Sequence, residues 1–166
     1  MKKLIVAFAA ALLITACGDS GSSISEQVLE NQPGVSDVQI GDNGSSATIQ
    51  VEENGTSATI AVGGAEIPED FPIPLPDGGE TGSVIQSTGP EGQSSGSVVV
   101  AYPAERWDEI LAFYQNWAET LPPDRFVNVI SGASPAAQIF SEQAGVSVNL
   151  GVSDDQVLVI ATTGTP

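Results

Sequence analysis

The stretch VSVNLGVSDDQVLVIA, residues 146–161, decides the fold of this 166-residue chain. Apolar residues occupy every second position from Val146 to Val152, as in a strand that buries one face. The polar segment Ser153–Gln156 has the length of a tight turn, and the run Val157–Ala161 that follows is apolar throughout. The pattern predicts two strands joined by a hairpin turn, within an antiparallel sheet.

Upstream of this hairpin, Pro103 opens the clearest helical pattern of the chain. Apolar residues recur at three- and four-residue intervals, acidic residues occupy the first turn, where the helix dipole favours them, and Pro122-Pro123 ends the pattern. A helix with one apolar stripe must bury it against another element, so we expect these residues to be core rather than the lining of a sugar or peptide groove. The stripe consists of Trp107, Ile110, Leu111, Tyr114, Trp117, Ala118 and Leu121.

Further strands are predicted on both sides of the helix, at residues 83–88, 97–102 and 126–130, with a looser one at 136–140. We therefore predict an α+β fold in which residues 82–166 form a two-layer domain of β-β-α-β-β-β order. One helix packs on one face of a mainly antiparallel sheet.

An internal repeat precedes this domain. The sequence NGSSATIQV, residues 43–51, recurs eleven residues later as NGTSATIAV, residues 54–62. Asn-Gly favours the positive φ values of a type I′ turn, so each copy predicts a hairpin turn followed by a strand. With Val35–Ile40 in front, residues 24–64 are predicted to form a short helix, at 24–30, and an N-terminal β-meander. One meander face gathers Val38, Ile40, Ala47, Ile49, Val51, Ala58, Ile60 and Val62.

Residues 65–81 are a proline-rich connector between the two regions. Proline denies donors to a sheet and favours extended backbone, and Phe71, Ile73 and Leu75 are expected to pin the connector onto the following domain. We also expect the meander or the connector to cover part of the sheet face opposite the helix. The residues that test this expectation are Val98, Val100, Val146, Val157 and Val159.

The lone cysteine of the chain, Cys17, carries the clearest functional signal. Residues 1–16 begin with Lys2 and Lys3 and continue with an apolar run too short to span a bilayer, which is typical of a secretory signal peptide. The segment Leu13–Cys17 closely resembles the bacterial lipobox, in which the cysteine is acylated after cleavage. The resemblance implies that Cys17 is a lipidation site and that residues 17–23 are a flexible tether.

The whole layout resembles small exported bacterial lipoproteins, a group that brings no assigned activity. It is carried by Glu26 and Leu29, the connector from Glu69 to Gly78, and a helix with Phe113 and Tyr114; the usual glycine-tryptophan pair after the helix is replaced by residues 122–126. Because Gly18, not aspartate, follows the cysteine, the resemblance implies a lipid anchor at the periplasmic face of the outer membrane, provided the source has two membranes.

The charge balance excludes nucleic-acid binding. The chain has 21 acidic and four basic residues, a net charge of −17. Loss of the signal peptide would leave Arg106 and Arg125 against the 21 acids, a net charge of −19. Such a field repels phosphate backbones. The acidity is compatible with solubility in saline surroundings or with weak binding of divalent cations.

The residue inventory excludes most catalytic mechanisms. There is no histidine, and no lysine follows the signal peptide, so the usual nucleophile–base pairs and zinc sites lack a member. Asp42-Asn43-Gly44 and Asp154-Asp155 lack the ligand spacing of a calcium loop and are predicted to be turns. We therefore expect no catalytic residue, no cofactor and no metal site.

These observations favour a membrane-anchored, non-catalytic envelope lipoprotein that acts as a binding or structural module for an envelope protein partner. Two alternatives remain open from the sequence: an acidic lipoprotein that binds divalent cations weakly, and a carboxylate-dependent hydrolase.

Overall fold

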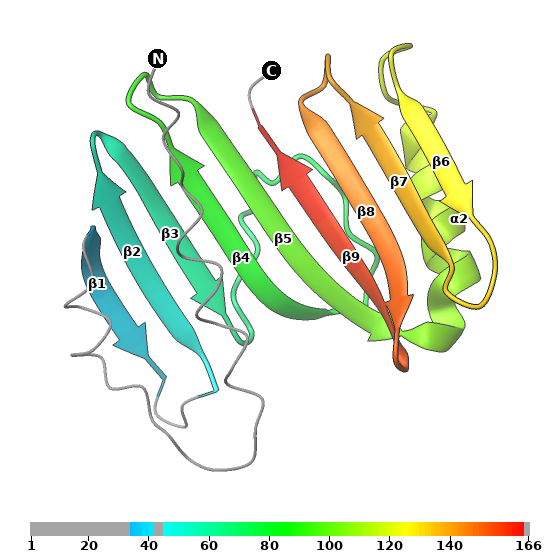
Figure 1. Cartoon of the computed structure of the whole chain (residues 1–166), viewed down its shortest axis with the longest axis horizontal. Coiled ribbons are helices and arrows are strands. Elements are labelled where there is room, and N and C mark those ends of the chain that lie inside the picture. The colour runs from blue at the N-terminus through cyan, green and yellow to red at the C-terminus, as the bar shows by residue number, and fades with distance from the viewer. Residues whose placement is uncertain (1–33, 42–44, 165–166) are drawn as a thin grey trace.

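The computed structural model describes residues 34–41 and 45–164, and this part of the chain is largely β-structure. Nine strands form one antiparallel sheet in the order β1-β2-β3-β4-β5-β9-β8-β7-β6 (Figure 1). The elements are β1 (Val35–Ile40), β2 (Ala47–Glu53), β3 (Thr56–Val62), β4 (Glu80–Thr88), β5 (Ser94–Pro103), the 3₁₀ turn η1 (Ala104–Arg106), α2 (Trp107–Ala118), β6 (Phe126–Ile130), β7 (Ala136–Ser141), β8 (Val146–Ser153) and β9 (Gln156–Thr163).

The predicted α+β fold with a separate meander is wrong, because one sheet runs through both regions. Strand β3 pairs with β4 from Ser57↔Thr88 to Val62↔Ser83, so the meander extends the sheet of the C-terminal region. The predicted β-β-α-β-β-β order is also wrong, since four strands follow α2 and β9 lies between β5 and β8. The physical reason is edge pairing: joining β3 to β4 satisfies two rows of backbone groups that separate sheets would leave open.

The local elements themselves match the sequence patterns. Asn54 and Gly55 have φ values of 52° and 80°, the positive pair that a type I′ turn requires, and β2 and β3 pair on either side of them. Helix α2 also lies where the apolar stripe predicts it. The turn of the first repeat, at residues 42–44, lies outside the described residues, as do the predicted helix at 24–30, the tether and Cys17.

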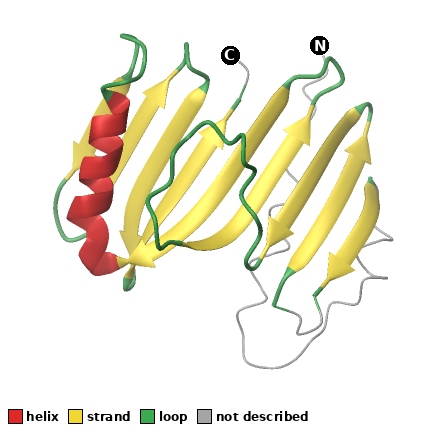
Figure 2. Cartoon of the chain, turned by 180° about the vertical axis from the view of Figure 1, so that it is seen from behind, coloured by secondary structure: helices red, strands yellow, loops and turns green. Residues whose placement is uncertain are grey.

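The core lies between the sheet and two segments on one of its faces. Helix α2 covers the β6–β8 end, and an irregular segment crosses the middle of the same face (Figure 2). The helix buries Ile110, Tyr114 and Ala118, and Trp107 and Trp117 pack against the same cluster, so the expectation that this stripe is core is confirmed. The Tyr114 ring also meets Phe113 and Trp117 edge to face, at centroid distances of 5.1 and 6.0 Å.

The irregular segment is the proline-rich connector, and we refer to residues 65–79 as the strap. Ile73 is 1% exposed, and Phe71 and Leu75 pack against the core, so the predicted pinning of the connector is confirmed. The far end of the strap is held by polar contacts: the Tyr102 hydroxyl donates to the Pro76 carbonyl at 2.8 Å, and Arg106 Nη1 donates to the Asp77 carbonyl at 2.8 Å.

The sheet buries opposite faces at its two ends. In β4–β9 the core residues, such as the neighbours Val84 and Val98, point toward α2 and the strap. In the meander, the register Val38↔Ile49↔Ile60 continues to Ile85, which points the other way from Val84. The predicted apolar face of the meander therefore exists, but it lies on the side of the sheet away from the helix.

Candidate binding surface

The sheet face away from α2 and the strap, which we call the open face, is the main candidate site. Alternation along the strands places Val99 and Ala101 of β5 and Leu158 and Ile160 of β9 at its centre. Its β6–β7 end carries Phe126, Ile130 and Phe140. Polar residues without charge complete this part of the face: Ser97, Asn128, Gln138, Ser147, Asn149 and Thr162.

Several large apolar side chains on this face are exposed. Ile160 and Phe140 are each 41% exposed, Phe126 is 53% exposed and Ile130 is 56% exposed. Ile85, which continues the apolar row of the meander, is 39% exposed. Isolated exposed apolar residues are normal on a monomer, whereas contiguous ones mark sites of interaction. The register pairs Phe126 with Phe140, Ile160 with Val99, and Ile85 with Ile60. Uncharged polar residues, Ser97, Ser147 and Asn149, lie between these pairs, so the face carries apolar clusters within an uncharged polar surface.

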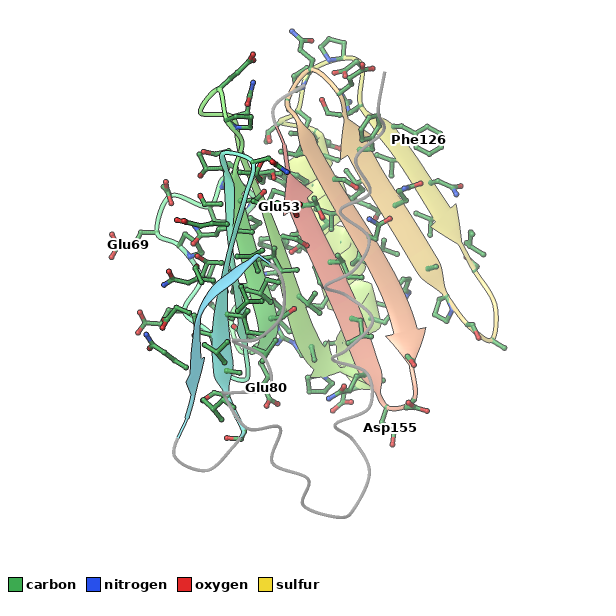
Figure 3. All side chains as sticks on the ribbon, turned by 60° about the vertical axis from the view of Figure 1, so that its left-hand side comes forward. Glu53, Glu69, Glu80, Phe126 and Asp155 are labelled. Atoms are coloured by element: carbon green, nitrogen blue, oxygen red, sulfur yellow. The ribbon has the colours of Figure 1, made fainter. Side chains whose placement is uncertain are left out.

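The open face is also free of charge over most of its width. Strands β5–β9 contain no acidic or basic residue, although the chain carries 21 acids. Glu53 and Glu80 stand at strand ends and Asp155 lies in the β8–β9 turn, so these carboxylates border the face at the ends of the strands (Figure 3). The result is an uncharged centre about 25 Å wide, at ~4.8 Å per strand, with an acidic border.

The five valines named above for the sheet face opposite the helix lie on the helix side of the sheet instead. Val98, Val100 and Val146 are 1%, 3% and 7% exposed, and Val157 and Val159 are fully buried, all within the core under α2 and the strap. The strap does cover part of the sheet, but on the helix side. In Val98–Ala101 and Val157–Ala161, apolar residues stand at consecutive positions instead of every second one. This was the sequence signal that both faces of the central strands are apolar.

A cleft of about 540 Å³ lies at one end of the strap, between Pro68–Pro72, the β4–β5 hairpin and the β7–β8 turn. Its volume is in the range of small-molecule pockets. Gln86, Gln93 and Thr163 supply polar side chains, and Asp70 is the one carboxylate among the lining residues that the structure describes. Cleavage of glycosides by paired acids requires a second carboxylate ~5 to 10 Å from the first. In its described lining, the cleft therefore combines hydrogen-bonding side chains with a single carboxylate.

The described residues bring no three potential metal ligands of the Asp, Glu, Cys or His type together. Asp154 and Asp155 form the tight β8–β9 turn, as predicted, with Asp154 at a φ of 53°. The other proposed turn, Asp42-Asn43-Gly44, lies outside the described residues.

The groups with shifted pKa values lie away from the open face and hold the fold together. Burial raises the pKa of the Tyr102 phenol to about 12, and burial raises the pKa of Tyr114 as well. A hydrogen bond from Arg106 lowers the pKa of Glu109. The Gln143 backbone N–H and the Ser141 hydroxyl donate to Asp124 and lower its pKa.

No family model matches the chain, and neither a curated protein nor a solved structure matches it. In the part of the chain that the structure describes, no helix is both long enough and apolar enough to cross a bilayer.

Proposed function

We propose that this chain is a non-catalytic lipoprotein of the cell envelope, anchored by a lipid on Cys17, and that its open face docks another envelope protein. The anchor would hold the protein at the periplasmic face of the outer membrane in a source with two membranes. The resemblance of residues 13–17 to a lipobox supports the anchor. No cofactor or metal takes part in this proposal.

The observation that carries the docking role is the absence of charge from strands β5–β9 in a chain whose net charge is −17. In a strongly acidic protein, a sheet face that is only exposed to solvent is expected to carry some of the carboxylates. Among the described residues, the acids occupy loops, helix α2, the 3₁₀ turn, the strap, strands β1 and β2 and the first position of β4, while Phe126, Phe140 and Ile160 remain exposed.

The border of the face indicates the chemistry of the partner. Interface centres are depleted of charge, and complementary charge at the rim steers the approach of two proteins. With Glu53, Glu80 and Asp155 at the border, the fitting partner has an apolar, uncharged patch with lysine or arginine around it. Association should therefore weaken as salt is raised, since rim charges are screened beyond ~8 to 10 Å.

The docking role can be tested with one added charge. Ile160→Asp places a carboxylate at the centre of the open face, whereas Gln50→Glu adds the same charge at an exposed position on the other face of the sheet. After crosslinking in intact envelopes, the same partner should be recovered with wild type and Gln50→Glu and lost with Ile160→Asp. Equal recovery with both variants, each shown to be folded by its melting curve, would exclude the open face.

The anchor is tested separately by mass spectrometry of the protein isolated from its own membrane. We expect the mature chain to begin at Cys17 and to carry acyl groups there. An unmodified Cys17, or a chain that retains residues 1–16, would refute the anchoring while leaving the docking test unaffected.

A further inference from the structure

Strand β6 forms one edge of the sheet, and none of the described strands lies along its outer side (Figure 1). Within the described residues its one partner is β7, in the register Phe126↔Phe140 to Ile130↔Ala136. All five of its residues are exposed. Phe126 and Ile130 lie on the open face, while Val127 and Val129, which are 41% and 38% exposed, lie on the helix side. The strand is thus apolar on both faces and accessible from its edge.

Strand β6 also lacks the features that normally protect an edge. Sheet edges are usually blocked by charges, prolines or bulges. The sequence of β6, FVNVI, contains neither a charged residue nor proline, and its pairing with β7 is regular. The opposite edge of the sheet, β1, carries Asp37 and an irregular register between Val35 and Asp37. The two edges therefore differ, and only β6 is suited to pair with another strand.

The sequence of β6 is self-complementary about its central residue, Asn128. In an antiparallel pair of two β6 strands centred there, Phe126 faces Ile130 of the second copy, and Val127 faces Val129. Asn128 faces its own counterpart, where two amide side chains can exchange hydrogen bonds. A two-fold interface requires a patch that complements itself. This symmetry of the sequence argues for a second copy of the chain as the occupant, rather than a strand of another protein.

We propose that β6 is the interface of a two-fold symmetric dimer, in which two sheets join through antiparallel β6 strands centred on Asn128. The residues that flank β6 allow two copies of this highly acidic protein to come together without charge repulsion at the strand. Asp124 and Arg125 would face Gly132 and Ser131 of the second copy, so no two like charges are placed opposite each other. The two-fold axis is perpendicular to the sheet, so both open faces lie on the same side and form one continuous surface.

The decisive test is a disulfide across the axis. In the full chain with Cys17→Ser, Asn128→Cys supplies the single thiol. Opposed residues of an antiparallel pair have Cα atoms about 4.5 to 5.5 Å apart, within the range of a disulfide. Gln138→Cys is the matched control, because Gln138 pairs with Asn128 one strand inward and would lie three strand spacings, about 14 Å, from its counterpart. We expect mild oxidation to double the mass of Asn128→Cys and leave Gln138→Cys monomeric.

Sedimentation of variants without cysteine substitutions gives a second readout. Asn128→Asp places two carboxylates against each other at the axis and should weaken dimerisation by about tenfold or more, whereas Gln138→Glu adds the same charge beyond the screening length and should change it little. A wild-type chain that sediments as a monomer at its highest soluble concentration would overturn the proposal. So would a dimer in which the folded Asn128→Cys variant remains unlinked, because the interface would then lie elsewhere.

Discussion

Replacing Gly79 with alanine tests whether the strap is part of the packed core. Gly79 ends the strap, and a Cβ atom at this position would lie 2.6 Å from two ring atoms of Tyr102 and still closer to a methyl carbon of Val100. Carbon atoms normally approach to about 3.5 to 4.0 Å, so these neighbours would have to move by about 1 Å. Both are buried, and Tyr102 is tied to Pro76 by its hydroxyl. The methyl group therefore overpacks a rigid site.

The expected effect follows from two opposing terms. Overpacking of a filled core costs about 1 to 3 kcal/mol, and the lower backbone entropy of alanine in the unfolded chain offsets about 0.4 to 1 kcal/mol of this. We expect the free energy of unfolding to fall by about 1 to 2 kcal/mol. With a urea dependence of about 1 to 3 kcal/mol per molar, the unfolding midpoint should move down by about 0.3 to 2 M.

Gly151→Ala is the matched control, because the same change is made where there is room. Gly151 lies in β8, has no positive φ, and its added Cβ would meet no atom within 4 Å. We expect this variant to be unchanged or more stable by about 0.4 to 1 kcal/mol. Urea unfolding followed by the fluorescence of Trp107 and Trp117 measures both variants. A Gly79→Ala variant as stable as wild type would refute the packing of the strap.

Three further predictions follow from buried or hydrogen-bonded groups. Ile73→Ala should lower the free energy of unfolding by about 2 to 5 kcal/mol in the same assay, since Ile73 is 1% exposed, and a negligible loss would contradict its place in the core. Tyr102 and Tyr114 are the only tyrosines, so absorbance at 295 nm should show little tyrosinate in the folded protein at pH 10. Because their pKa values are raised on folding, the stability they contribute is full below pH 10 and is lost as the pH rises toward 12. Half-ionisation near pH 10 in the folded protein would contradict this. The Asp124 carboxylate accepts a hydrogen bond from the Gln143 backbone N–H, so its pKa measured by carbon-13 NMR should lie below 3.8. The stability that it contributes is present above its unfolded pKa and is lost as the pH falls through its folded pKa. A pKa at or above 3.8 would be inconsistent with this hydrogen bond.

The candidate site was only partly accessible to sequence reasoning. The lipidation site Cys17 was found from local sequence and stays a prediction, because it lies outside the described residues. The meander or the connector was expected to cover part of the face opposite the helix, whereas the strap covers the helix side, and the five valines named for that face lie in the core under the strap and α2. In a strand such as Val157–Ala161, the side chains that point to either face of the sheet are apolar, so periodicity does not indicate which of the two faces packs against the helix. The exposed edge of β6 depends on strand order, which no local pattern encodes.

The sequence by itself determined where the strands and the α-helix lie and the Asn54-Gly55 turn, because each depends on residues a few positions apart. Only the tertiary structure decided that β3 pairs with β4 across the strap, that β9 lies between β5 and β8, and which face of each strand is covered. These features arise from backbone pairing and side-chain packing between segments distant in the chain, where the gain depends on the partner and not on the segment alone.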